Sequence, residues 1–392
     1  MNGASLSNSR PHLLDVTRLI WRRWAGRLPT GIDRVCLAYL REYRSRSQAV
    51  VQARGFRRIL TESASDKLFD MLSVPGPGLR TELIKVLGGG RLRSFRDLPG
   101  RQRLYLNVGH TALQEPSFLA WTRASQVRPV YMVHDLIPIT NPEFCRAGEA
   151  DKHELRVRNV LASAVGVIGN SQATLDSLET FAARETLDTP STIAAPLGTD
   201  FRLNPHGRIA RQSRPTFVVL GTIEARKNHL MLLELWRGMV ARLGADTPRL
   251  LIIGQRGWEC DQVFEILDHD ERLRGAVIEV GRCTDPELTA HLKNARALLF
   301  PSLVEGYGLP LIEALHAGVP VIASDLPVFR EIGQNIPDFL DPMDPAAWER
   351  QILSYASDES ASRAAQLERL EGYRAPSWAD HFAGVNAWLE TL

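Results

Sequence analysis

The chain has 392 residues, which is too long for one ordinary domain and suits two. Hydrophobic residues make up 44% and charged residues 23%, as in globular proteins, and no apolar run of about 18 residues predicts a membrane-spanning helix. The formal net charge of +2 conceals a basic N-terminal section, because residues 1–60 hold twelve arginines and only three acidic residues. That section indicates an anionic partner or simply a solvated arginine surface.

The first half of the chain alternates apolar runs with helical patterns, which predicts an α/β domain with a parallel sheet. We expect strands at residues 12–17, 49–53, 104–108, 130–133, 165–169 and 192–195. We expect helices at residues 32–43, 117–125, 145–162 and 172–185. Between residues 55 and 103 the pattern is weaker, and glycine and proline clusters predict loops between short helices.

A polar stretch at residues 198–215 predicts an interdomain linker, after which the strand–helix rhythm restarts. Further strands are expected at residues 216–221, 249–254, 277–280, 297–300 and 319–323. The tail, residues 377–392, has apolar residues at helical spacing and should form an amphipathic helix. We therefore predict two Rossmann-like, doubly wound α/β domains facing a cleft, at residues 1–205 and 206–375. A C-terminal helix at 376–392 is expected to pack back toward the first domain.

Four widely separated cysteines form no Cys-x-x-Cys pair, which argues against a zinc site or a disulfide framework and fits a reducing cytoplasm. The first ten residues are polar, so we expect no secretory signal and a cytoplasmic protein. There is no P-loop and no Gly-x-Gly-x-x-Gly turn opening a helix, so nucleotide hydrolysis and dinucleotide redox chemistry lose support.

The most informative segment runs from Glu305 to Glu313, Glu-Gly-Tyr-Gly-Leu-Pro-Leu-Ile-Glu, just after the expected strand at 297–300. Gly306 and Gly308 allow a ligand to approach the backbone, and Pro310 suits the first turn of a helix. Free N–H groups at such a helix start bind phosphate. The two carboxylates can accept hydrogen bonds from different hydroxyls of one ligand, as in a sugar or a ribose.

This segment resembles the Glu-x7-Glu signature of glycosyltransferase family 4, retaining enzymes with the two-domain GT-B fold. Other matching stretches follow in the family's order along nearly the whole chain, most weakly at residues 55–103. They are Thr30-Gly-Ile-Asp-Arg-Val35, Val133-His-Asp135, Asn170-Ser171, Pro196-Leu-Gly-Thr-Asp200 and Gly221-Thr-Ile-Glu-Ala-Arg-Lys-Asn228. Thr30 stands where many members have a second glycine.

The resemblance implies roles for individual residues. Arg226 and Lys227 would clamp the donor diphosphate and stabilise it as it departs, the task of a metal in other enzymes, so no metal or other cofactor is expected. With His134 and Glu305 they form the predicted catalytic set. The predicted donor-binding residues are Gly31, Gly221, Gly306, Tyr307, Gly308, Leu309 and Glu313. His134 ends an apolar strand, so a buried structural histidine is the competing interpretation.

Acceptor binding is expected in the first domain, by resemblance. Arg22, Arg23 and Arg27 lie close to Trp21 and Trp24, in what we expect to be the loop after the first strand. Tryptophan beside arginine is typical of a lipid headgroup boundary, so the segment predicts contact with an anionic membrane carrying a polyprenyl-diphosphate-linked glycan. Packed tryptophans beside solvated arginines are an equally good interpretation. His110 is a further candidate for contact with donor or acceptor.

Together these features predict a retaining hexosyltransferase that uses a nucleotide diphosphate sugar. The stretches around His134 and His229 look most like bacterial mannosyltransferases of surface polysaccharide assembly, which favours mannose from GDP-mannose. The alternatives are a GT-B scaffold protein without catalysis and a GT-B nucleotide-sugar epimerase or hydrolase. Nucleic acid is not an expected partner, because no RNP, zinc-finger or clear helix-turn-helix pattern is present.

Overall fold

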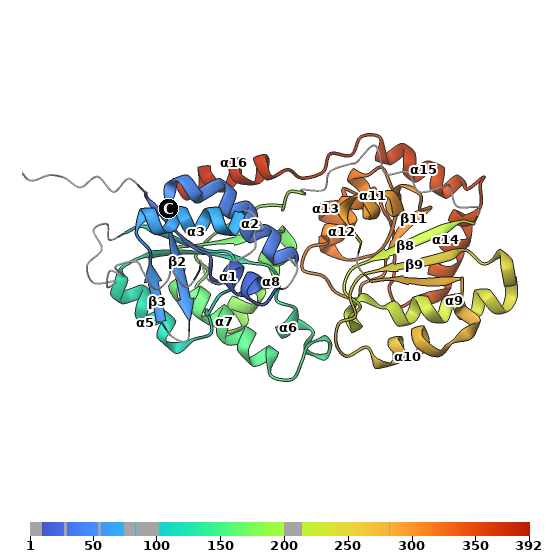
Figure 1. Ribbon diagram of the computed structural model, residues 1–392, viewed down its shortest axis with the longest axis horizontal. Helices are drawn as coiled ribbons and strands as arrows, with labels where there is room; N and C mark the ends of the chain where they lie inside the picture. The colour runs from blue at the N-terminus through green and yellow to red at the C-terminus, as the bar shows by residue number, and fades with distance from the viewer. Residues whose placement is uncertain are drawn as a thin grey trace, which may run out of the picture. The chain divides into compact units, whose positions relative to one another are not determined.

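The computed structural model describes residues 10–26, 30–53, 56–73, 83, 102–199, 214–281 and 283–392. It divides into two compact units (Figure 1). Unit 1 comprises residues 1–197 together with Trp378–Leu392, and unit 2 comprises Gly198–Ser377. The predicted linker at 198–215 lies mostly outside the described residues. Each unit is built around its own sheet.

The sheet of unit 1 has seven strands in the order β3-β2-β1-β4-β5-β6-β7. Six of them run parallel, and only β3 pairs antiparallel, at the edge beside β2. The bounds are β1 His12–Asp15, β2 Ser47–Ala53, β3 Phe56–Ile59, β4 Leu104–Asn107, β5 Arg128–Val133, β6 Gly166–Gly169 and β7 Ser191–Ala194. Strands β4 and β6 are buried along their whole length, as expected of a parallel sheet covered on both faces.

The helices of unit 1 connect these strands. They are α1 Thr17–Trp24, α2 Gly31–Tyr43, α3 Glu62–Ser73, α5 Pro116–Ser125, α6 Ile137–Thr140, α7 Glu149–Ser163 and α8 Gln172–Arg184. Local sequence sets several of their starts. The Ser171 side chain accepts a hydrogen bond from the backbone N–H of Thr174 at the start of α8, and α5 begins with a proline.

The last helix of the chain, α16 (Trp378–Leu389), belongs to unit 1 and lies beside α2 in Figure 1. Phe382 packs edge-on against Tyr39 and Tyr43 of α2. The buried His381 ring lies 2.9 Å from the Tyr39 hydroxyl through Nε2, and its Nδ1 lies 3.1 Å from the carbonyl oxygen of Pro196. Aromatic packing and buried polar contacts thus join helix α16 to helix α2 and to the segment that follows β7.

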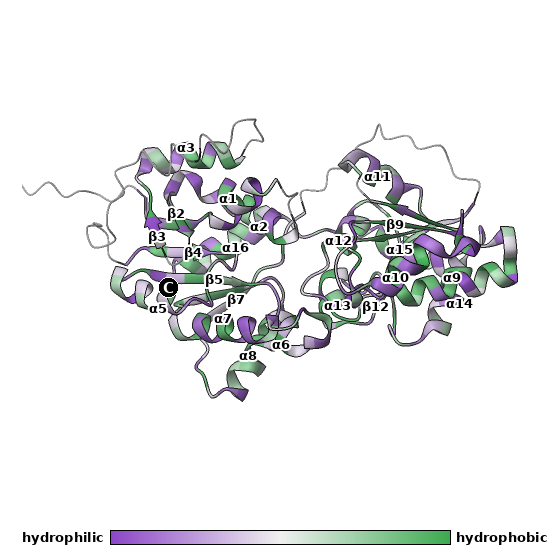
Figure 2. Ribbon diagram, turned by 60° about the horizontal axis from the view of Figure 1, so that its bottom comes forward, coloured by the Kyte–Doolittle hydropathy of each residue, from purple (hydrophilic) through white to green (hydrophobic). Residues whose placement is uncertain are grey.

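Unit 2 contains a six-stranded sheet, entirely parallel, in the order β10-β9-β8-β11-β12-β13. The strands are β8 Thr216–Leu220, β9 Arg249–Ile253, β10 Val277–Val280, β11 Ala297–Phe300, β12 Val321–Ser324 and β13 Asp338–Leu340. The helices are α9 His229–Leu243, α10 Asp261–His269, α11 Asp285–Lys293, α12 Leu309–His316, α13 Pro327–Gly333, α14 Pro345–Ala356 and α15 Ala361–Leu370. Hydrophobic and hydrophilic residues alternate along the covering helices, such as α10 and α14 (Figure 2).

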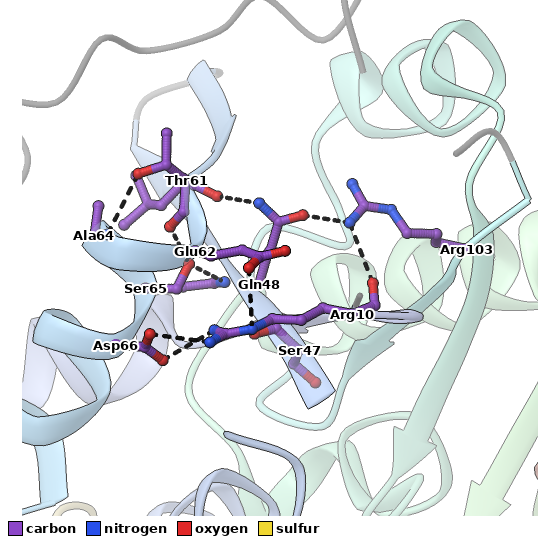
Figure 3. Close-up of polar contacts among 11 residues, drawn as sticks. Arg10, Ser47, Gln48, Thr61, Glu62, Ala64, Ser65, Asp66 and Arg103 are labelled. Carbon is purple, nitrogen blue, oxygen red and sulfur yellow. Dashed lines mark hydrogen bonds and ion pairs between the residues drawn. The ribbon is translucent and has the colours of Figure 1, made fainter. Parts of the chain in front are cut away.

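A polar network closes the amino-terminal edge of the first sheet (Figure 3). The Arg10 guanidinium, just before β1, donates two 2.9 Å hydrogen bonds to the carboxylate of Asp66 on α3 and one of 3.2 Å to the carbonyl of Ser47 on β2. Gln48 accepts from the Arg103 side chain and donates to the Leu60 carbonyl. The charged groups of this network stabilise the fold. They lie at the edge of the sheet opposite the carboxyl ends of its strands.

The predicted fold class, two α/β domains with parallel sheets, is confirmed. Three elements differ from the prediction. Strand β1 ends at Asp15 and helix α1 follows at once, so Arg22 and the two tryptophans lie on a helix and not in a loop. The edge strands β3 and β13 were not predicted, because each is short and neither is a plain apolar run. None of the described helices has the length and apolar character needed to span a bilayer.

Candidate functional site

The predicted catalytic residues of unit 2 lie close together in the loops that follow two neighbouring strands of its sheet. Strand order reverses between the neighbours β8 and β11, and ligands of doubly wound sheets bind beyond the carboxyl ends of such a pair. Arg226 and Lys227 lie on a short 3-10 turn after β8, and Glu305 lies in the loop after β11. The backbone carbonyl of Arg226 accepts a 2.8 Å hydrogen bond from the N–H of Leu303, which holds the two loops together.

Glu305 is the centre of an ion cluster. One carboxylate oxygen accepts from Lys227 Nζ and, at 2.8 Å, from the Ser302 hydroxyl, while the other accepts from Arg226 Nη1 at 2.7 Å. Arg226 also donates to the Glu224 carboxylate at 3.0 Å. Burial by itself would raise the pKa of Glu305, but the charges of Arg226 and Lys227 outweigh it and lower that pKa to about 2.

Lys227 is buried beside the aromatic ring that ends β11. Its Nζ lies 4.9 Å from the centroid of the Phe300 ring, and only 8% of the residue is exposed. Burial lowers the pKa of Lys227, and the Glu305 carboxylate opposes that shift. Gly221 has a φ of +141°, and a Cβ there would lie 3.6 Å from Nζ, so the backbone passes close to the ammonium group.

The loop between Glu305 and α12 follows the conformation predicted from its glycines. Gly308 has a φ of +120° and precedes Leu309, the first residue of α12, with Pro310 in the first turn. Tyr307 is buried at the start of this turn, and Glu313 is 97% buried within α12. The structure therefore gathers Gly221, Gly306, Tyr307, Gly308, Leu309 and Glu313 around the ion cluster or on the helix that starts beside it.

Other predicted site residues lie in unit 1. His134 follows β5, is buried, and contacts the carbonyl oxygen of Val108 at 2.8 Å. His110 follows β4 with a φ of +57°, contacts the Met132 carbonyl at 2.7 Å, and lies 4.8 Å from His134 between ring centroids. Both histidines therefore lie at the carboxyl edge of the first sheet, and their catalytic or binding roles stay predictions.

The predicted acceptor-binding arginines are engaged within unit 1. Arg22 forms a 2.8 Å ion pair with Asp33, and Arg23 donates to the carbonyl of Leu72. Arg27 lies outside the described residues. Gly31, a predicted donor-binding residue, opens helix α2, where Asp33 and Thr30 form a capping box, so a carboxylate already lies at this helix start.

Sequence reasoning missed several polar neighbours of the site. Ser302 and Glu224 complete the ion cluster, and Ser302 could have been proposed because it lies in the same loop as Glu305. In unit 1, His153 and Arg156 of α7 join His110, as described below. No sequence signal identified them, because an amphipathic helix carries many such residues.

The match to known families falls on unit 2. A model of the family "Glycosyl transferases group 1" matches residues 204–369. The match covers most of unit 2, which we refer to as the group 1 domain. The ion cluster and the helix-start glycines of this group 1 domain therefore lie in the segment that carries the family match, which confirms the resemblance predicted from the sequence.

The chain is also similar to two curated mannosyltransferases of Escherichia coli. The chain is 30% identical over 232 residues to "Serotype-specific mannosyltransferase WbdA" of Escherichia coli, covering 54% of this chain and 28% of that protein. It is 31% identical over 159 residues to "O-antigen chain mannosyltransferase B" of Escherichia coli, covering 41% of each. The chain thus spans well under two thirds of the length of these relatives. The resemblance to bacterial polysaccharide mannosyltransferases is confirmed.

Among solved structures, "Crystal structure of Anabaena Alr3699/HepE in complex with UDP" aligns with a TM-score of 0.66 and 15% identity. The alignment covers 98% of this chain and 100% of that one. Similarity at this level of identity concerns the fold alone. The alignment covers both units, so unit 1 shares the GT-B fold as well as the group 1 domain.

Proposed function

We propose that the protein is a retaining hexosyltransferase that uses a nucleotide diphosphate sugar. The observation that carries the proposal is the buried cluster of Arg226, Lys227 and Glu305 beyond β8 and β11, within the group 1 domain. Two adjacent cations in a site shielded from water can neutralise a departing diphosphate, and such electrostatic stabilisation acts most strongly on the transition state.

The cluster also suggests how the donor enters. Without ligand, the two cations are balanced by the carboxylates of Glu305 and Glu224. A diphosphate carries more negative charge than either carboxylate, so it competes for Arg226 and Lys227 and leaves Glu305 able to accept from a sugar hydroxyl. Glu313 would accept from a second hydroxyl, in line with the two-carboxylate pattern of the sequence.

Retention at the anomeric carbon is the stereochemistry we propose, by family resemblance. No described side chain near the cluster is a convincing nucleophile, so we favour front-side attack, with the departing diphosphate taking the acceptor proton. Among the described residues no group of three or more His, Cys, Asp or Glu is arranged to hold a metal ion. We propose that Arg226 and Lys227 stabilise the departing diphosphate in place of a metal ion, so that transfer needs no metal.

We further propose mannose as the transferred sugar, GDP-mannose as the donor and a lipid-linked surface polysaccharide as the acceptor. The names of the two E. coli relatives, a serotype-specific and an O-antigen chain mannosyltransferase, support this choice. The alternatives of an inactive scaffold and of an epimerase or hydrolase gain no support from these names.

A peripheral contact with the inner face of the membrane is part of this proposal, together with a cytoplasmic location. Its structural support is helix α1, where Trp21 is 51% and Trp24 36% exposed. Tryptophans of this kind favour the headgroup region. Because Arg22 and Arg23 bind within the unit, Trp21→Ser is the better test, and binding to anionic vesicles that survives this change would remove the membrane proposal.

The experiment that tests the function is calorimetric titration of the full chain with GDP-mannose, UDP-glucose and ADP-glucose, with and without EDTA. We expect one donor to bind, EDTA to have no effect, and Lys227→Ala to abolish binding while the exposed Lys293→Ala leaves it intact. Incubation with that donor and a lipid-linked glycan should then extend the glycan. Binding to none of the donors, or loss of binding with EDTA, would refute the proposal.

A further inference from the structure

Unit 1 carries a second cluster of basic side chains at the carboxyl edge of its own sheet. Strand order reverses there between the neighbours β1 and β4. Arg18 follows β1 on helix α1, His110 follows β4, and His134 follows β5. This edge is where a doubly wound sheet binds ligands, and it lies outside the group 1 domain.

The members of this cluster are in contact from one strand end to the next. A Cβ on Gly109 would lie 3.1 Å from the Cβ of Arg18, so the Arg18 side chain rests on the loop that carries His110. The His110 ring is 4.8 Å from the His134 ring and 6.0 Å from the ring of His153 on α7. We refer to Arg18, His110, His134, His153 and Arg156 as the His–Arg cluster.

Arg156 is the member with the least satisfied side chain. Its Nη1 donates to His153 Nδ1 at 2.8 Å, and among the described residues its buried Nε meets no hydrogen-bond partner. In the part of the chain that the structure describes, no carboxylate forms an ion pair with it. A buried donor without a partner costs free energy, and a guanidinium is suited to bind two oxygens of one anion.

The histidines are neutral, so the charge of the cluster is that of its arginines. Since His153 Nδ1 accepts from Arg156, its proton is on Nε2, which donates to the Asp135 carbonyl at 3.0 Å. Burial lowers the pKa of His153 and His110, and lowers that of His134 to about 4.

The nearby carboxylates each have a hydrogen-bond or ion-pair partner other than Arg156. Asp33 binds Arg18 at 2.7 Å, Asp135 accepts from the N–H of Ile137, and Glu149 accepts from Lys152. Arg18 therefore shares its charge with Asp33, whereas Asp135 and Glu149 act on Arg156 through their charge alone, without an ion pair among the described residues. The cluster thus offers one cation without an ion pair among the described residues, one cation shared with Asp33, and neutral imidazoles.

We propose that the His–Arg cluster binds a phosphate group of the acceptor, with Arg156 as its main charged contact and Arg18 as the second. Phosphate oxygens would satisfy Arg156 Nε and accept from the Arg18 guanidinium, beside imidazole rings whose own N–H groups stay bonded to backbone carbonyls. The identity of the phosphate as the acceptor's rests on the proposed function, while the anion site itself rests on the contacts above. The substrate class is a sugar or lipid phosphate, as opposed to an uncharged glycan end.

The test uses the full chain with Lys227→Ala, which removes a cation from the other unit, and ¹⁵N-labelled histidine. Imidazole signals are followed during titration with inorganic phosphate and pyrophosphate at constant ionic strength, and are assigned by single His→Gln substitutions. We expect saturable shifts of His110 and His153. Arg156→Gln should weaken the apparent affinity by about tenfold or more, as one charged hydrogen bond is worth at least about 1.4 kcal/mol. Arg156→Lys should retain part of it.

Arg158→Gln is the matched control, because Arg158 lies two residues along the same helix and pairs with Glu154 and Glu185 at the surface. It should leave the shifts unchanged. Absence of saturable shifts, or equal shifts in Arg156→Gln, would overturn the site. Tighter binding of GDP than of pyrophosphate to the same signals would assign the site to the donor and overturn the acceptor assignment. A chain that binds phosphate here but no nucleotide sugar would refute the proposed function and leave this site standing.

Discussion

Trp388 of the last helix lies directly over Gly166 of strand β6: a Cβ at Gly166 would be 2.5 Å from Cη2 of the indole ring. The indole also donates a 2.9 Å hydrogen bond to the hydroxyl of Ser191 on β7. Helix α16 therefore reaches the sheet only because this strand position has no side chain. The aromatic contacts with α2 hold the other end of the helix.

Gly166→Ala should loosen α16. The added methyl group would push the indole outward and break its hydrogen bond, at a cost of about 1–3 kcal/mol. Amide hydrogen exchange within Trp378–Leu389 should become faster. The control is Gly238→Ala in helix α9, where a Cβ meets nothing within 4 Å, so a gain of up to about 1 kcal/mol is expected. Unchanged exchange of α16 in Gly166→Ala would contradict the prediction.

Gly308→Ala should be more damaging than Gly318→Ala. Both glycines have positive φ angles, +120° and +73°, so each substitution adds backbone strain of about 1–3 kcal/mol. At Gly308 the new Cβ would also lie 2.9 Å from Cε1 of Phe329, whereas at Gly318 it meets nothing within 4 Å. Chemical denaturation of unit 2 should show the difference, and donor affinity should fall only in Gly308→Ala. Equal effects of the two changes would count against the turn geometry.

Glu305→Gln should destabilise unit 2 by about 3 kcal/mol at neutral pH, because Arg226 and Lys227 lose their shared buried counter-charge. The pKa of Glu305 is about 2 in the folded protein and about 4.3 in an unfolded chain, so it is lowered by folding. Its stabilising effect is therefore complete above about pH 4.3 and disappears as the pH falls through about 2.

Denaturation curves of the parent protein and Glu305→Gln should converge over this acidic range. A saturating nucleoside diphosphate should restore more stability to the variant than to the parent, since it supplies the missing anion. The exposed Glu271→Gln, whose pairing with Arg274 is at the surface, serves as the control and should change stability by less than about 0.5 kcal/mol. A deficit that persists unchanged below pH 2 would show that charge is not its cause.

His134→Ala should lower kcat by about 100-fold or more while leaving nucleotide binding to the group 1 domain intact. The change should affect kcat and not nucleotide affinity, because His134 belongs to unit 1 and the ion cluster belongs to unit 2. Steady-state kinetics and calorimetry with the same protein sample measure them, with the exposed His269→Ala as the control. A parallel loss of nucleotide affinity would indicate a different role for His134.

Sequence patterns predicted the central strands well, because these are short buried apolar runs bounded by loops. Strand β11, buried along its whole length, has the bounds that we expected, and so has the edge strand β10. Helix α1 was missed because it has only eight residues, and its stability depends on partners distant in sequence, including Asp33 and the Leu72 carbonyl. Those contacts exist only once the sheet has formed.

The candidate site, too, could be predicted only in part from the sequence. The positions of Arg226, Lys227 and Glu305 relative to their strands could be predicted, since parallel strands present their carboxyl ends at one edge. Their mutual ion pairing could not, because the distance between two loops depends on backbone geometry such as the bond between Leu303 and Arg226. His153 and Arg156 lie on a helix with an ordinary amphipathic pattern, and only the packing of α7 reveals their neighbours.

Unit 1 contains both the segment up to Leu197 and Trp378–Leu392, so unit 2 is in effect an insertion within it. During synthesis the ribosome delivers all of unit 2 before it delivers α16, so the second unit can complete its core while the first still lacks its last helix. Tyr39, Tyr43 and the strand at Gly166 would remain uncovered until α16 has been made. A chain truncated after residue 377 should therefore contain a complete unit 2 attached to a unit 1 whose uncovered surface a chaperone recognises.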